Sequence, residues 1–267
     1  MTGRILAAAL LLLVCAAPAM AQAPDTVFLE AMTWTELRAA IRAGKTTIIV
    51  PAGGTEQNGP HMALGKHNAR VKALAERIAR ALGNALVAPV IAYVPEGGLS
   101  PATGHMRFPG TITVPDDAFQ RVLDSAARSF KLHGFRDVVF LGDHGSTQAG
   151  QKAVAARLNR EWRATPARAH AVEEYYRAAT SGFRELLHAR GFGPEELGEH
   201  AALPDTSLTL AIDPQLVRAN AQPEEIPGAG TGVDGDPRRA TAELGRLGVD
   251  LIVGRTVTAI KTSITHR

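Results

Sequence analysis

Cysteine is nearly absent from this sequence of 267 residues, because Cys15 is its only one and lies near the N-terminus. A lone thiol forms no intramolecular disulfide and excludes metal sites built from several thiolates. Aromatic residues make up only 5% of the chain, and no basic block accompanies the net charge of +3. A nucleic-acid surface normally has both features, so the sequence argues against nucleic-acid binding.

The N-terminal segment has the features of a secretory signal peptide. Arg4 precedes an apolar run over residues 5–17, and an Ala-Met-Ala tripeptide ending at Ala21 supplies small residues for cleavage. An uncleaved anchor is the alternative, but the run is shorter than the roughly 18 residues that span a bilayer. We expect cleavage after residues 1–21, and a periplasmic or secreted protein that begins near Gln22 and has no membrane contact.

The rest of the chain is long enough for one large α/β domain, which we assign to residues 27–267. Short β-rich apolar runs alternate with longer amphipathic patterns, which is typical of a mainly parallel sheet covered by helices on both faces. Two long loops rich in Gly and Pro, residues 94–114 and 222–236, are of the length that is usually functional or flexible. The predicted strands are residues 46–50, 86–90, 138–141, 169–171 and 251–253, and the predicted helices are residues 68–82, 116–133, 146–162 and 237–247.

Polar side chains capable of chemistry follow several of the predicted strands. Ligands of open α/β sheets bind at the carboxyl ends of the strands, so these side chains are candidates for a common site. They are Glu56, Asn58, His61 and His67 after the first strand, His105 in the loop 94–114, Asp143, His144 and Ser146 after the strand 138–141, and Glu199 and His200 farther along.

Several short motifs occur in order along the chain, and they are Glu56-Gln57-Asn58-Gly59-Pro60-His61, His105 before Phe108-Pro109-Gly110-Thr111, Gly142-Asp143-His144-Gly145-Ser146, His200-Ala201-Ala202 before Asp205-Thr206-Ser207, and Gly235-Asp236-Pro237. Taken together, these motifs resemble the creatininase family of metal-dependent amidohydrolases. The resemblance implies a three-layer α/β/α fold and a divalent-metal site. It also implies hydrolysis of a C–N bond in a small amide or lactam, and a homo-oligomer, in this family often a hexamer.

The family's metal ligands are only partly present in this chain. The position of a metal-binding His in the family pattern is Asn58 here, and the position of its metal-bridging Asp is His67. A Glu for the second metal would stand at Ser146 or Leu203. An amide, a hydroxyl and an aliphatic side chain do not replace an imidazole and a carboxylate as ligands for zinc or manganese. The second metal site is therefore predicted to be lost.

Glu56, His67 and His144 remain, and the resemblance makes them ligands of one divalent ion, zinc or manganese, with a position left for water. Such an ion lowers the pKa of bound water toward neutrality. Spacing alone would equally make His67 a polar residue at a helix N-terminus and His144 a hydrogen-bonding residue at a strand end. Asp143 is either a fourth ligand or a residue that orients His144, and we favour the second role.

Glu199 and His200 form the predicted acid/base unit, since amide hydrolysis requires a proton on the leaving nitrogen. The resemblance assigns this role to His200, whereas a solvated pair at a helix end is the alternative without it. The remaining candidates, Asn58, His61, His105 and Ser146, belong to the substrate pocket or to the surroundings of the metal, and their roles stay open.

Three functions are compatible with these observations. The first is a metallo-amidohydrolase that acts on a small-molecule substrate. The second is an inactive family member that binds a ligand or takes part in an assembly, which the altered metal positions favour. The third is a metal-dependent lyase or isomerase.

Overall fold

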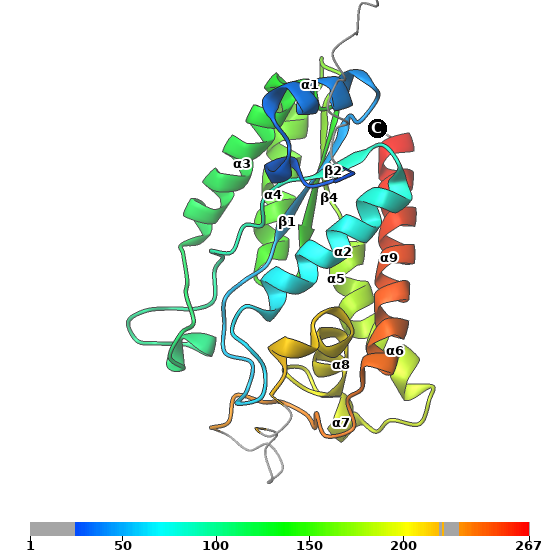
Figure 1. The fold of residues 1–267 in the computed structure, drawn as a ribbon. Helices are drawn as coiled ribbons and strands as arrows, with labels where there is room; N and C mark the ends of the chain where they lie inside the picture. Colours follow the sequence, from blue (N-terminus) through cyan, green and yellow to red (C-terminus); the bar gives the residue numbers. More distant parts are fainter. Residues whose placement is uncertain (1–24, 219–220, 222–229, 267) are drawn as a thin grey trace, which may run out of the picture.

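Four parallel strands form the sheet of this protein, in the order β2-β1-β3-β4 (Figure 1). They are β1 (Thr47–Ala52), β2 (Ala85–Val87), β3 (Asp137–Gly142) and β4 (Arg168–Ala171). The structure is a computed structural model that describes residues 25–218, 221 and 230–266. The predicted signal peptide and most of the predicted loop 222–236 therefore lie outside the described residues.

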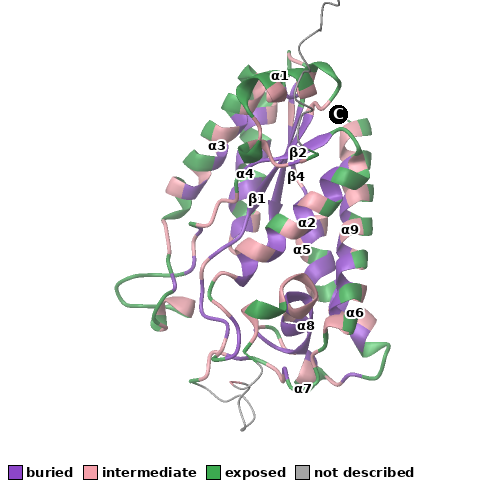
Figure 2. Cartoon of the chain, viewed as in Figure 1, coloured by how far each residue is buried: buried purple, intermediate pink, exposed green. Residues whose placement is uncertain are grey.

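Neighbouring residues of β1 enter two separate cores, because successive side chains of a strand point to opposite faces. Ile49 packs with α2 (Lys66–Leu82) and α9 (Ala242–Thr265). Ile48 and Val50 pack on the other face, with α3 (Asp116–Leu132) and α4 (Thr147–Glu161). Figure 2 shows the buried strands between helices whose outer faces are exposed. The predicted α/β fold, with a parallel sheet between two helical layers, is confirmed.

Shorter helices, which the sequence analysis did not anticipate, surround this framework. Thr33 begins α1 with a capping box, in which its side chain accepts from the amide of Glu36 while the Glu36 carboxylate accepts from the amide of Thr33. A π-helical turn over Ala178–Gly182 joins α5 to α6. These helices are α1 (Trp34–Arg42), α5 (Glu173–Arg177), α6 (Phe183–His188), α7 (Pro194–Leu197) and α8 (Leu203–Ile212), with 3₁₀ turns at Leu29–Ala31, Gly104–Arg107 and Pro214–Leu216.

The prediction of a strand at residues 251–253 is wrong, and the predicted helix 237–247 starts too early and ends too soon. The side chain of Thr241 accepts a hydrogen bond from the amide of Leu244, so α9 begins at Ala242, and it continues to Thr265. Contact with α8 overrides the local β preference of the apolar triplet. The buried residues of α9 recur at helical spacing, and they are Gly245, Gly248, Val249, Ile252, Thr256 and Ile260.

The strand order creates a crevice at the carboxyl edge of the sheet. The chain passes from β1 to β2 on one side and from β3 to β4 on the other, so the direction of winding changes between β1 and β3. Their last residues, Ala52 and Gly142, are paired, which brings the loops after both strands together. The loop 94–114 joins them through a bridge between Thr55 and Ile112. In the described ranges, no helix is both long and apolar enough to cross a membrane.

Candidate metal centre

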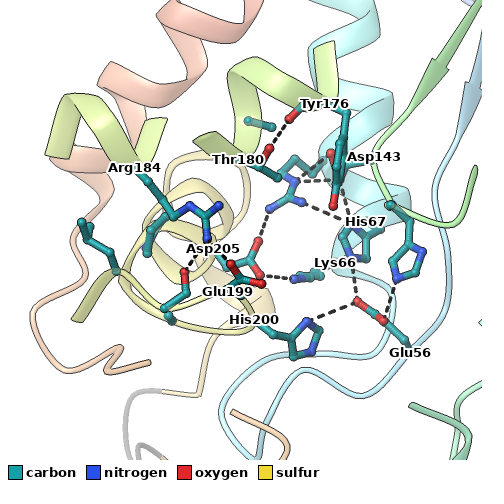
Figure 3. Close-up of a pocket in the computed structure, with 18 of the residues that line it drawn as sticks. Glu56, Lys66, His67, Asp143, Tyr176, Thr180, Arg184, Glu199, His200 and Asp205 are labelled. Carbon is teal, nitrogen blue, oxygen red and sulfur yellow. Dashed lines mark hydrogen bonds and ion pairs between the residues drawn. The ribbon is translucent and has the colours of Figure 1, made fainter. Parts of the chain in front are cut away.

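Glu56 is the fully buried centre of a cluster of imidazoles (Figure 3). Its Oε1 lies 2.7 Å from Nε2 of His67, which is in the first turn of α2. Its Oε2 lies 3.0 Å from Nε2 of His144, which follows β3, and 3.1 Å from Nε2 of His105 in the loop 94–114. Nδ1 of His200 is 3.9 Å from Oε1. The predicted convergence of the loop 94–114 with the Glu56 loop is therefore confirmed at His105.

His67 is oriented by Asp143. The Nδ1 of His67 donates to Oδ2 of Asp143 at 2.9 Å, which leaves Nε2 directed at Glu56. Arg70 and the hydroxyl of Tyr175 also donate to this carboxylate, so the buried Asp143 is held from three sides. Burial alone would raise the pKa of Asp143, but Arg70 and His67 hold it below its usual value. Asp143 thus contacts His67, whereas the sequence analysis placed it against His144.

Ser146 fixes the tautomer of His144. The Ser146 hydroxyl donates its single proton to the carbonyl of Pro95, so it accepts a hydrogen bond from Nδ1 of His144 at 2.7 Å. A longer contact of 3.3 Å joins the Ser146 amide to the same nitrogen and is the weaker of the two. With its proton on Nδ1, the neutral imidazole has a lone pair on Nε2 with which it can bind an ion.

The other two imidazoles are oriented by Gln57. Its side-chain amide accepts from the amide of Gly59 and donates to Nδ1 of His105 at 2.9 Å, so the proton of His105 is on Nε2 and points at Glu56. The main-chain carbonyl of Gln57 accepts from Nε2 of His200 at 3.0 Å. Nδ1 of His200 is therefore the nitrogen that carries a lone pair, and His200 lines the cavity described below.

Two buried carboxyl groups of the cluster have opposite pKa shifts. Burial alone would raise the pKa of Glu56, but hydrogen bonds and charge from His144 and His67 hold it well below the usual range. Glu96, in the loop 94–114, has its pKa raised to about 9 by burial and by the negative charge of Glu56. Sequence reasoning missed Glu96, although it is the only acidic residue in that loop.

Two predicted candidates, Asn58 and His61, serve the loops rather than the cavity. The amide of Asn58 donates to the carbonyls of Glu56 and Ala63, which holds the turn after β1. His61 donates from Nε2 to the hydroxyl of Thr206, and burial lowers its pKa. Leu203 is a buried core residue at the start of α8. The positions at which the family places further ligands are thus occupied by residues with other partners.

A cavity of about 450 Å³ opens beside the imidazoles. Its lining includes Tyr176, Thr180 and Arg184 from the helical segment α5–α6 (Figure 3). The side chain of Glu199 is 77% exposed and accepts from Arg184 at 3.2 Å. No hydrogen bond or ion pair joins Glu199 to His200 in the part of the chain that the structure describes. Glu199 therefore lies at the rim of the cavity, while His200 reaches the cluster.

A second charged network, which the sequence analysis missed, ties α2 to α8. Asp205 accepts from Lys66 at 2.6 Å, from Arg70 at 2.7 Å and from the amide of Ala201 at 3.0 Å. Burial opposes its ionisation, but Lys66 and Arg70 lower the pKa of Asp205 well below its usual value. The contact to Ala201, which has a positive φ of 55°, fixes the turn that carries His200.

Two sets of donor atoms are close enough to hold a metal ion among the described residues. One is Glu56, His67 and His144, the other is Glu56, His105 and His200, and within each set the atoms lie within 4.8 Å of one another. In the first set both imidazoles keep a proton on Nδ1 and present Nε2. In the second, Gln57 leaves a proton on the nitrogen of His105 that faces Glu56. The first set therefore fits a divalent ion better.

The fold and this cluster define an α/β protein with a potential divalent-metal site at the carboxyl edge of a parallel sheet. The sequence profile described as Creatininase, creatinine amidohydrolase, matches residues 30–260. The chain belongs to the creatininase family.

Curated relatives are hydrolases by name. The chain is 27% identical over 206 residues to 3-dehydro-scyllo-inosose hydrolase of Thermotoga maritima, which covers 73% of this chain but only 58% of that protein. It is 26% identical over 201 residues to creatinine amidohydrolase of Pseudomonas putida, covering 72% and 74% of the two chains. It is also 28% identical over 225 residues to a mycofactocin precursor peptide peptidase of Mycobacterium ulcerans, covering 75% and 78%.

Solved structures show the same fold. A crystal structure of creatinine amidohydrolase superposes with a TM-score of 0.74 at 24% identity, covering 90% of this chain and 99% of the other. Related structures include a manganese form of creatininase and a mutant creatininase of Zn–Zn type, with TM-scores of 0.74 and 0.69. The last two are manganese and zinc forms, and both are divalent metals.

Proposed function

We propose that this protein is a metal-dependent amidohydrolase that cleaves a C–N bond of a small amide or lactam with one divalent ion. The observation that carries the proposal is the convergence of Glu56, His67 and His144 beside a cavity of about 450 Å³. Membership of a family whose homologues are amidohydrolases supports the reaction class.

Within the cluster, Glu56, His67 and His144 would hold the metal, and His200 would transfer protons. When bound, the divalent ion supplies Lewis acidity that polarises a carbonyl and activates water. His200 holds its proton on Nε2 through Gln57. Burial and the positive charge of Lys66 lower the pKa of His200 to about 4. Its Nδ1 is therefore unprotonated near neutral pH, and it can accept a proton from water and deliver it to the leaving nitrogen.

The test is turnover of a panel of small amides and lactams by metal-replete protein, followed by mass spectrometry. We expect His67→Ala to lose both metal and turnover. The matched variant is His200→Gln, because a glutamine amide retains a donor for the carbonyl of Gln57 but removes Nδ1. It should keep its metal and lose about 100-fold or more in kcat. Full turnover by His200→Gln, or by metal-free protein, would contradict the proposed roles.

A ligand-binding protein without catalysis is the second candidate. Asn58 and Ser146 favour it, because both stand at metal-ligand positions of the family pattern and are engaged in loop contacts. The same panel separates the two candidates. Compounds that raise the melting temperature of the metal-replete protein without being converted would support the binding function.

Export and assembly belong to the proposal as well. The N-terminal features support a mature periplasmic or secreted protein that begins near Gln22. Intact-mass analysis of the cell-envelope fraction tests this, and a full-length species retained in the cytoplasm would overturn it. The family resemblance supports a homo-oligomer, which light scattering on the purified protein measures.

A further inference from the structure

As an ionised carboxylate, Glu96 is a buried group without a hydrogen-bond donor. Its side chain has no exposed surface, and neither Oε1 nor Oε2 has a hydrogen bond of ordinary geometry in the part of the chain that the structure describes. Buried polar groups are almost always paired, so an orphan carboxyl in a native site needs an explanation. An ion that the protein binds is one such explanation.

The position of Glu96 points to a cation beside His144. Its Oε2 lies 3.1 Å from Nε2 of His144, the nitrogen that also lies 3.0 Å from Oε2 of Glu56. Because Ser146 takes the proton of Nδ1, this nitrogen has a lone pair and two carboxylate oxygens around it. A proton shared among these three acceptors pairs only two of them at a time. A metal ion satisfies all three at once.

The two separations from His144 match those of neighbouring ligands on one ion. Metal–ligand bonds of 2.0–2.2 Å place neighbouring donor atoms about 3.0–3.5 Å apart in tetrahedral or octahedral coordination. The separations from His144 are 3.0 Å to Glu56 and 3.1 Å to Glu96.

The chain holds Glu96 in this position from several sides. The amide of Glu96 donates to the hydroxyl of Thr113 at 2.9 Å, and Ser146 donates to the carbonyl of Pro95. Gly54 leaves room for the carboxyl, since a Cβ atom there would lie 2.6 Å from Oε1. The segment that carries Glu96 is thus anchored to Thr113 of the same loop and to Ser146, which follows β3.

We propose that Glu96 is a fourth protein ligand of a divalent ion bound by Glu56, His67 and His144. The inference rests on the metal site of the proposed function. The family pattern places a carboxylate at the position of Ser146. In this chain Glu96 supplies a carboxylate from another segment, and Ser146 holds that segment through its hydrogen bond to Pro95. The resulting set of two carboxylates and two imidazoles is neutral with a dication bound.

The test measures metal affinity and coordination rather than activity. Metal-free wild type and Glu96→Gln are titrated with Zn²⁺ against a competing chelator, and both are saturated with Co²⁺ for visible absorption. We expect Glu96→Gln to bind Zn²⁺ at least about tenfold more weakly. Its saturated Co²⁺ complex should show shifted d–d bands, because one protein ligand is missing.

Two control variants separate ligation from charge and folding. Glu199→Gln removes a charge at the rim of the same cavity, and its affinity for Zn²⁺ should stay within about twofold of the wild type. Glu96→Asp keeps the carboxylate but shortens its reach, so it should also weaken binding. Circular dichroism and urea titration of each metal-free variant establish that it is folded before metal is added.

The outcomes distinguish this inference from the proposed function. Wild-type affinity and an unchanged Co²⁺ spectrum in Glu96→Gln would overturn the role of Glu96 and leave the metal-dependent function standing. Equal losses in Glu96→Gln and Glu199→Gln would also overturn it, since charge alone would account for the effect. If the wild type binds no divalent ion, the inference and the proposed function fail together.

Discussion

Asp143 accepts a hydrogen bond from Nδ1 of His67 at 2.9 Å, so the carboxylate after β3 orients an imidazole that belongs to α2. Carboxylate–histidine pairs of this kind fix the tautomer of metal-binding imidazoles and raise their basicity. The contact joins two segments that are 76 residues apart in sequence. It makes the orientation of His67 dependent on the packing of α2 against the sheet.

The first prediction concerns this pair. Asp143→Asn retains the shape of the side chain but removes the charge that stabilises the Nδ1 proton of His67. We expect the affinity for Zn²⁺ to fall about 10–100-fold. Isothermal titration calorimetry of metal-free protein measures it, and an unchanged dissociation constant would mean that Asp143 has no part in the metal site.

The second prediction concerns Arg70, whose side chain is only 4% exposed and pairs with both Asp143 and Asp205. Arg70→Met leaves the buried Asp143 and the partly buried Asp205 without this partner. We expect the free energy of unfolding to fall by about 3–5 kcal/mol, as measured by urea titration. Arg121→Met is the control, because Arg121 pairs with Asp117 on the exposed face of α3 and its loss should hardly move the midpoint.

The third prediction is a pH dependence of stability that arises from His200. Its pKa in the folded protein is about 4, against 6.5 in an unfolded chain. As pH falls through this window, the unfolded chain takes up a proton that the folded protein does not, so stability decreases. His200→Gln removes this effect. Between neutral pH and pH 4, the wild type should therefore lose up to about 3 kcal/mol more unfolding free energy than His200→Gln.

Urea titrations of metal-free wild type and His200→Gln across that pH range make the comparison. His61 is also buried with a lowered pKa, but it is common to both proteins and cancels in the difference. Parallel stability curves for the two proteins would show that His200 titrates normally in the folded state.

The fourth prediction uses two glycines with positive φ. Gly54→Ala would place its Cβ 2.6 Å from Oε1 of Glu96 at a φ of +151°, so the carboxyl must shift from its position beside His144. Gly44→Ala is strained at a φ of +99° but has nothing within 4 Å of its Cβ. Both variants should lose stability, but only Gly54→Ala should bind Zn²⁺ more weakly. Equal affinities in the two variants would contradict the position assigned to Glu96.

Much of the fold was predictable from local patterns. The runs that became β1 and β3 are apolar and rich in β-branched residues, and the helices α2, α3 and α4 follow from amphipathic periodicity. The triplet Leu251-Ile252-Val253 has the same composition as a strand. It is helical because α9 packs closely on α8, and that contact depends on the whole fold.

The candidate site was predictable only in part. Motif order identified Glu56, His67 and His144, and the paired ends of β1 and β3 explain why they meet. Glu96 belongs to no motif, and its position beside His144 depends on Thr113, Ser146 and the space left by Gly54. Asp143 was placed beside the wrong imidazole, because adjacency in sequence favoured His144 whereas α2 presents His67.

The central claim is that one divalent ion binds at Glu56, His67 and His144, and elemental analysis tests it most directly. The mature protein is stripped of metal, reconstituted separately with excess Zn²⁺ and Mn²⁺, desalted and measured by mass spectrometry alongside His67→Ala. We predict about one ion per chain in the wild type with at least one of these metals, and none in the variant. Two tightly held ions per chain, or none with either metal, would contradict the account.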